Sequence, residues 1–101
     1  MTTPLDELAE YMKDKPGTLL FEALFKYDST YVGHTHVRRS RAEAALRLPD
    51  ALREDFTCFY GLVEKGEYAK SWLVDIGDAY SGTADNWLDA LAAAILAKEK
   101  P

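Results

Sequence analysis

The feature that most restricts the fold is a pair of β-prone runs, residues 56–63 and 67–76, joined by a short turn that contains Gly66. Both runs are rich in aromatic and β-branched residues. The glycine can adopt the left-handed conformation that tight hairpin turns demand. Alternate residues of the second run lie largely on one face, with Lys70 as the polar exception: Tyr68, Trp72, Val74 and Ile76. We therefore expect an antiparallel hairpin with one buried face.

A helix is expected before this hairpin. Ser40 and Glu43 stand at the spacing of a capping box, in which each side chain satisfies a backbone N–H at the helix start. Pro49 is expected to end this helix or to restart a short turn. The helix has a narrow apolar face of small residues, made by Ala42, Ala45 and Leu46.

A stronger helix is expected at the end of the chain, capped by Thr83. Asp85 and Asp89 lie near its positive end, and Lys98 and Lys100 near its negative end, where each charge opposes the helix dipole. Its expected core stripe consists of Leu88, Leu91, Ala92, Ile95 and Leu96.

The N-terminal part begins with Thr3 and Pro4, which are typical of a helix start. Four apolar residues then follow at helical spacing up to about residue 14: Leu5, Leu8, Ala9 and Met12. Residues 18–27 fit both a helical stripe and strand alternation. The turn residues 28–30 and the β-prone run 31–38 that follow favour a strand, and thus a first hairpin.

These elements follow the order α-ββα-ββα. The fold class is therefore α+β, with an antiparallel sheet of about four strands in two hairpins packed against helices. A chain of 101 residues is long enough for one hydrophobic core, so we expect a single domain over residues 1–101.

The strand, glycine loop and alanine-rich helix from Trp72 to Ala97 resemble the closing unit of small phage and prophage αβα-sandwich proteins. The resemblance covers about a quarter of the chain. It implies a small mobile-element protein of unassigned activity, acting in the cytosol of a host, and it carries over no catalytic residue.

The main charge anomaly is the segment from Tyr31 to Arg41, YVGHTHVRRSR. Residues 34–41 hold three of the twelve Lys and Arg and none of the seventeen Asp and Glu, so the rest of the chain sums to −8. We predict a partner-binding surface here, because arginine binds carboxylates and phosphates with a forked geometry. Its residues are His34, His36, Arg38, Arg39 and Arg41. The competing interpretation is that these arginines pair with the protein's own acids.

A second candidate surface lies around Tyr80 and Trp87, at the start of the last helix. Trp and Tyr dominate the energetics of many protein interfaces, although they also serve as lids on a core.

Other functional classes find less support. The sequence contains no GxSxG, GxxxxGK[ST] or GxGxxG motif, so we expect no enzyme and no cofactor. His34 and His36 have the spacing of a metal-binding pair, but a third ligand is not evident, and we expect no metal. Cys58 is the only cysteine, which indicates a reducing compartment, and no apolar run is long enough to span a membrane. We expect a cytoplasmic protein.

The net charge of −5 opposes general attraction to nucleic acid, so any such binding must be local. The hypothesis is a non-enzymatic binding protein that docks on or inhibits a protein or nucleoprotein partner. The alternative is an RNA- or nucleotide-binding protein that uses the basic strand from His34 to Arg41. A homodimer formed through an unpaired hairpin edge is also possible.

Overall fold

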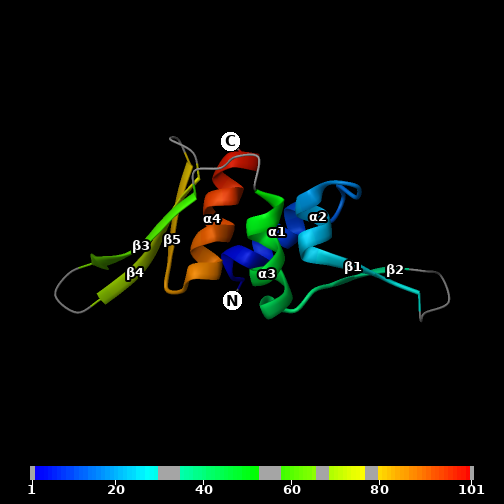
Figure 1. Cartoon of the computed structure of the whole chain (residues 1–101), viewed down its shortest axis with the longest axis horizontal. Coiled ribbons are helices and arrows are strands. Elements are labelled where there is room, and N and C mark those ends of the chain that lie inside the picture. The colour runs from blue at the N-terminus through cyan, green and yellow to red at the C-terminus, as the bar shows by residue number, and fades with distance from the viewer. Residues whose placement is uncertain (1, 30–34, 53–57, 66–68, 77–79, 101) are drawn as a thin grey trace. The chain divides into compact units, whose positions relative to one another are not determined.

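The structure is a computed structural model that describes residues 2–29, 35–52, 58–65, 69–76 and 80–100, with only the backbone for 58–65 and 69–71. The chain divides into two units, one of Ala9–Glu54 and one of Met1–Leu8 with Asp55–Pro101. The elements along the chain are α1 (Pro4–Met12), α2 (Leu19–Leu24), β1 (Phe25–Asp28), β2 (Thr35–Arg38), α3 (Arg41–Ala51), β3 (Cys58–Lys65), β4 (Ala69–Ile76), β5 (Tyr80–Ala84) and α4 (Trp87–Glu99) (Figure 1).

Helices and antiparallel strands confirm the α+β class and the order of the two hairpins along the chain. The expectation of one sheet is wrong in detail. β1 and β2 form a two-stranded sheet, while β3, β4 and β5 form a separate three-stranded sheet in that order. The prediction of a single domain over residues 1–101 stays a prediction. Among the helices of the described residues, none has the length and apolar character needed to cross a membrane.

In the unit Ala9–Glu54, α2 packs against α3 and leads directly into β1. Residues 18–27 thus divide between the two structures that their pattern allows: a helix to Leu24 and a strand from Phe25. Gly17 adopts a positive φ of 90°, and the Thr18 hydroxyl accepts a hydrogen bond from the Phe21 N–H, which starts the helix. The buried residues of α2 are Leu20, Phe21, Ala23 and Leu24.

The helix α3 begins as predicted, because the Ser40 Oγ accepts the Glu43 N–H at 3.2 Å. Two expectations about it are wrong. Pro49 lies inside the helix, which continues to Ala51 although proline cannot donate to the preceding turn. The buried side chains are Ala44 and Leu48, whereas Leu46, expected on the apolar face, is 78% exposed.

In the other unit, α4 packs against β4 and β5 (Figure 1). Its buried residues include Leu88, Leu91, Ala92 and Ile95 of the predicted stripe, whereas Leu96 is only partly buried. Asn86 rather than Thr83 caps this helix, because Thr83 belongs to β5 and pairs with Leu73. The Asn86 Oδ1 accepts the Asp89 N–H at 2.9 Å.

Residues 80–82, expected in the glycine loop before the last helix, belong to the strand β5, and the close contact of β5 with α4 depends on Gly82. A Cβ atom at Gly82 would lie 2.3 Å from the Ala94 nitrogen, 2.5 Å from the Ala90 oxygen and 2.7 Å from the Ala93 Cβ. Glycine on the strand and alanines on the helix therefore allow the two backbones to approach each other.

Asp89 is a buried polar residue of this core, with 6% of its surface exposed. Its carboxylate accepts hydrogen bonds from the Asn86 side-chain amide at 2.7 Å and from the Leu5 N–H at 3.4 Å. The second bond joins the start of α1 to the start of α4 across most of the sequence. Because both carboxylate oxygens are hydrogen-bonded, the burial of this group is tolerated.

Candidate docking surface on the first hairpin

The hairpin β1–β2 presents an aromatic face. Phe25 pairs with Arg38 and Tyr27 pairs with His36. Because directly paired residues and alternate residues of an antiparallel sheet share one side, these four side chains lie on the same side. We call the side formed by Phe25, Tyr27, His36 and Arg38 the hairpin face.

Ring contacts order this face. The rings of Phe21 and Phe25 stack with centroids 4.8 Å apart, and the His36 imidazole meets Phe21 edge to face at 5.1 Å. The Tyr27 ring also meets the His36 imidazole edge to face, with their centroids 5.4 Å apart. Phe21 is buried, while Tyr27 is 57% exposed. The aromatic cluster is therefore anchored in α2 and reaches solvent at Tyr27.

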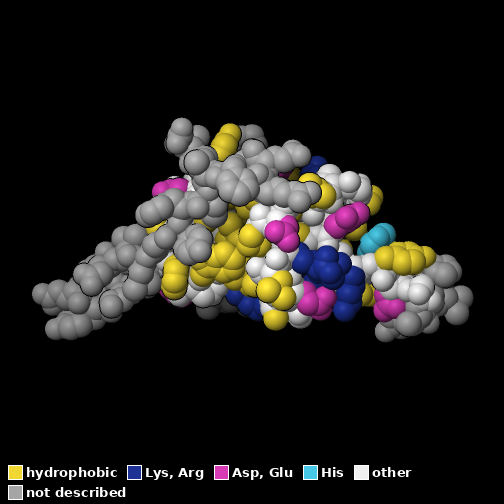
Figure 2. All heavy atoms as spheres, in the orientation of Figure 1, with side chains coloured by type: hydrophobic (Ala, Val, Ile, Leu, Met, Phe, Trp, Pro, Cys, Tyr) yellow, Lys and Arg dark blue, Asp and Glu magenta, His cyan; other side chains and the backbone are white. Residues whose placement is uncertain are grey.

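A hollow of about 220 Å³ lies beside these rings. Its lining includes Phe21, Phe25, Tyr27 and His36, together with the cationic residues Lys26, Arg39 and Arg47. Figure 2 shows Lys and Arg side chains gathered near the base of the hairpin, with Asp and Glu side chains at the margin. The hollow thus combines aromatic surface with positive charge.

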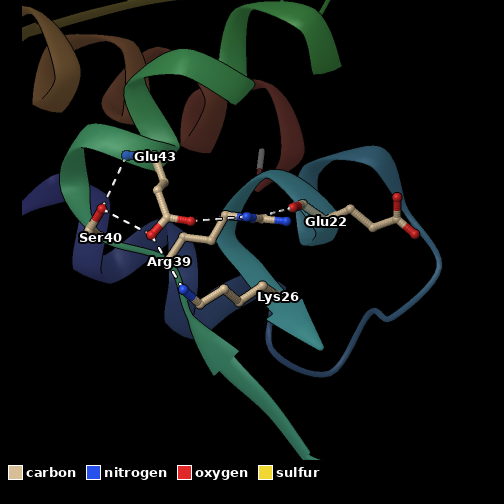
Figure 3. Close-up of polar contacts among 5 residues, drawn as sticks. All are labelled: Glu22, Lys26, Arg39, Ser40 and Glu43. Atoms are coloured by element: carbon tan, nitrogen blue, oxygen red, sulfur yellow. Dashed lines mark hydrogen bonds and ion pairs between the residues drawn. The ribbon is translucent and has the colours of Figure 1, made fainter. Parts of the chain in front are cut away.

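Arg39 has a structural role at the base of the hairpin. Its backbone N–H donates to the Leu24 oxygen at 2.8 Å, and its Nε donates to the Glu22 oxygen at 2.9 Å (Figure 3). Both acceptors are carbonyls at the end of α2 that have no partner within the helix. Arg39 therefore caps α2 and holds the hairpin to it.

Glu43 connects this region to α3. Its carboxylate accepts a hydrogen bond from Arg39 at 3.1 Å and lies 3.5 Å from the Lys26 Nζ (Figure 3). Desolvation acts to raise the pKa of Glu43, but the Arg39 hydrogen bond, the Lys26 charge and hydrogen bonds from Ser40 outweigh it, so the pKa lies below its usual value. Arg39 is accordingly neutralised within the protein, with only 14% of its side chain exposed.

The other predicted site residues are distributed as follows. His36, Arg38 and Arg41 are exposed on or next to β2, and His34 lies outside the described residues. Tyr80, at the start of β5, is 37% exposed, and Trp87 is half-buried in the first turn of α4. The structure thus groups His36 and Arg38 on the hairpin face and shows Arg39 engaged in internal contacts.

The contribution of α2 and α3 to this surface is not evident from the sequence. Phe21, Tyr27 and Arg47 join it only because α2 packs against α3 and continues into β1. Phe21, Ala23, Phe25 and Tyr27 fit strand alternation in the sequence, but the first two lie in α2, and nothing in the sequence related Arg47 to them.

No family model, no curated protein and no solved structure matches this chain.

Proposed function

We propose that this chain is a non-enzymatic binding protein that docks on a protein or nucleoprotein partner through the hairpin face. The observation that carries the proposal is the exposed aromatic cluster of Tyr27 and His36, held from below by the buried Phe21. Tyr and Arg are enriched among the residues that dominate protein interfaces. An aromatic group fixed before binding loses little conformational entropy when a partner covers it.

The resemblance over Trp72–Ala97 adds the proposal that the partner is a host component and that docking inhibits it. The single Cys58 suits a reducing compartment, so we place this activity in the cytoplasm.

Comparison of two exposed tyrosines tests the proposal. The immobilised chain, a Tyr27→Ala/His36→Ala variant and a Tyr80→Ala variant are each incubated with a cytosolic lysate of the source cell. We expect the unmodified chain and Tyr80→Ala to retain the same polypeptide. The double variant should retain at least about tenfold less, as loss of an interface hot spot implies.

The comparison also separates the two candidate surfaces. If only Tyr80→Ala fails to retain the polypeptide, the docking site lies in the region of Tyr80 and Trp87. Equal retention by all three chains would refute the proposal. Circular dichroism of each variant checks that the fold is preserved.

The RNA-binding alternative rests on the cationic residues of the hairpin. It predicts that nuclease treatment of the lysate removes the retained material, and that retention declines steeply with salt because binding releases counterions. The net charge of −5 and the internal neutralisation of Arg39 favour the protein partner.

A further inference from the structure

We infer that the hollow beside the hairpin face binds a carboxylate from an acidic segment of a partner protein, and that Arg47 is the residue that binds it. This inference rests on the proposed docking function and specifies the chemistry of the partner. The charge that the hollow offers to a ligand depends on which of its cations are already neutralised.

Among the described residues, three cations line the hollow, and two of them share one carboxylate. Lys26 and Arg39 both contact Glu43, at 3.5 Å and 3.1 Å. The Arg39 Nε also donates a hydrogen bond to the Glu22 carbonyl oxygen. One negative charge therefore serves two positive charges, and a net positive charge remains at this place.

Arg47 is the third cation. It is exposed on α3, and among the residues that the structure describes it has no hydrogen bond or ion pair. A guanidinium in this state offers two parallel N–H donors, which match the geometry of a carboxylate. Binding of a carboxylate here breaks no internal contact of the guanidinium.

Among the described residues of the lining, Glu22 is the acidic one. Figure 3 shows its carboxylate pointing away from Arg39, which it contacts through its backbone oxygen. Glu22 therefore does not neutralise Arg39. Among the residues that the structure describes, the three cations of the lining together with Glu22 and Glu43 have a net charge of +1, and an anionic group complements it.

The aromatic rings define the rest of the ligand. A carboxylate bound at Arg47 places the adjoining part of its chain against rings of the same hollow, including Phe25 and Tyr27. An acidic segment that carries an aromatic or apolar residue satisfies both parts. Nucleic acid suits the site less well, because its affinity comes from many cations and a single available guanidinium supplies one.

The probe is a fluorescein-labelled peptide, Gly-Glu-Glu-Trp-Glu-Glu-Gly, with the version that has Gln in place of Glu as its control. Binding is measured by fluorescence anisotropy at low salt, and its location by NMR shifts of the chain. We expect the acidic peptide to bind at least about tenfold more tightly than the Gln version, because a charge-assisted forked pair is lost. The shifts should include Tyr27, His36 and Arg47.

Variants of the chain test whether Arg47 is the residue that binds the acidic peptide. Arg47→Gln should weaken binding by about tenfold, whereas Arg47→Lys should recover part of it. Lys100→Gln, which removes one charge from an exposed position in the other unit, should leave binding unchanged. Equal binding of the two peptides, or no effect of Arg47→Gln, would overturn the inference.

Two further outcomes reassign the occupant. Tighter binding of an oligouridine of matching length would indicate nucleic acid. Self-association of the chain alone in sedimentation velocity, lost in Arg47→Gln, would indicate a second copy. Either result contradicts the inference.

The inference and the proposed function can fail separately. If the acidic peptide does not bind but Tyr27→Ala/His36→Ala still loses the lysate partner, the docking surface stands and the acidic ligand is wrong. If that double variant retains the partner, both fail.

Discussion

Glu43 holds charges from two elements, Lys26 on β1 and Arg39 after β2, to the start of α3. Its pKa is lowered in the folded protein, so the folded state binds its proton less readily than the unfolded state does. The resulting stabilisation is present above the ordinary pKa of about 4.5 and is lost as the pH falls through the lower, folded value.

The variant Glu43→Gln tests this stabilisation by the ionised Glu43 carboxylate. Its melting temperature should lie below that of the unmodified chain at pH 7, and the difference should shrink as the pH falls below the ordinary glutamate pKa of 4.5 and through the lower pKa of folded Glu43, because Glu43 itself is then protonated. Thermal unfolding followed by circular dichroism measures it. Glu22→Gln is the control, since that carboxylate points away from the cluster (Figure 3). A difference that stays constant from pH 7 to about pH 3 would contradict this account.

Gly82 provides the other prediction for a single residue. Gly82→Ala would force a Cβ within 2.7 Å of three atoms of α4, two of which belong to the backbone and cannot rotate away. We expect a loss of about 3 kcal/mol in the free energy of unfolding, measured with urea, at the upper end of what overpacking costs. Gly17→Ala is the control for backbone conformation, because Gly17 has φ of 90° and open space around it. That variant should lose about 1 kcal/mol, and an equal or smaller loss at Gly82 would argue against close packing of β5 on α4.

Among whole elements, α3 has a start that the sequence predicts and a buried face that it does not. The start of the helix depends on local hydrogen bonds between Ser40 and Glu43, so the sequence predicts it. The buried face depends on which neighbour the helix meets. Ala44 and Leu48 are buried, whereas Leu46 is exposed, and a helix with small apolar residues on several sides does not indicate which side is inward.

The same distinction explains the strands. The paired runs of the second hairpin were predicted because their β-prone residues are adjacent in sequence. β5 was missed because its sequence, YSGTA, lacks apolar alternation and its buried residue is a glycine. The hairpin face was predicted only in part. His36 and Arg38 follow from the basic segment, but Phe21 and Arg47 reach the hollow through tertiary packing of α2 on α3.

A pair of leucines tests the orientation of α3. Leu48 is fully buried and Leu46 is 78% exposed. Leu48→Ala should cost about 2–5 kcal/mol in the free energy of unfolding, while Leu46→Ala should change it by less than about 0.5 kcal/mol. Urea denaturation of both variants measures the difference. A larger loss of stability in Leu46→Ala than in Leu48→Ala would show that the buried face is the one predicted from the sequence.

Across the whole molecule, charge is divided unevenly between the two units. Ala9–Glu54 holds eight Lys and Arg against seven Asp and Glu, a net charge of +1. The other unit holds four against ten, a net charge of −6, and together they give the −5 of the chain. The average acidity therefore conceals a unit that is nearly neutral and slightly basic. An acidic partner meets little repulsion from that unit, which is consistent with docking at its hairpin.

Stability should also differ across the molecule. The sheet β1–β2 has two strands of four residues, a size that is marginally stable without further support, whereas β4 and α4 contain the fully buried Val74, Ile76, Leu91 and Ile95. In hydrogen exchange followed by mass spectrometry, amides of 25–28 and 35–38 should exchange faster than those of 74–76 and 88–95. Addition of a docked partner should slow exchange in the hairpin more than in α4, because an interface there restricts local opening. Slow exchange in the free hairpin would disprove the expected difference in stability, and partner protection confined to α4 would place docking elsewhere.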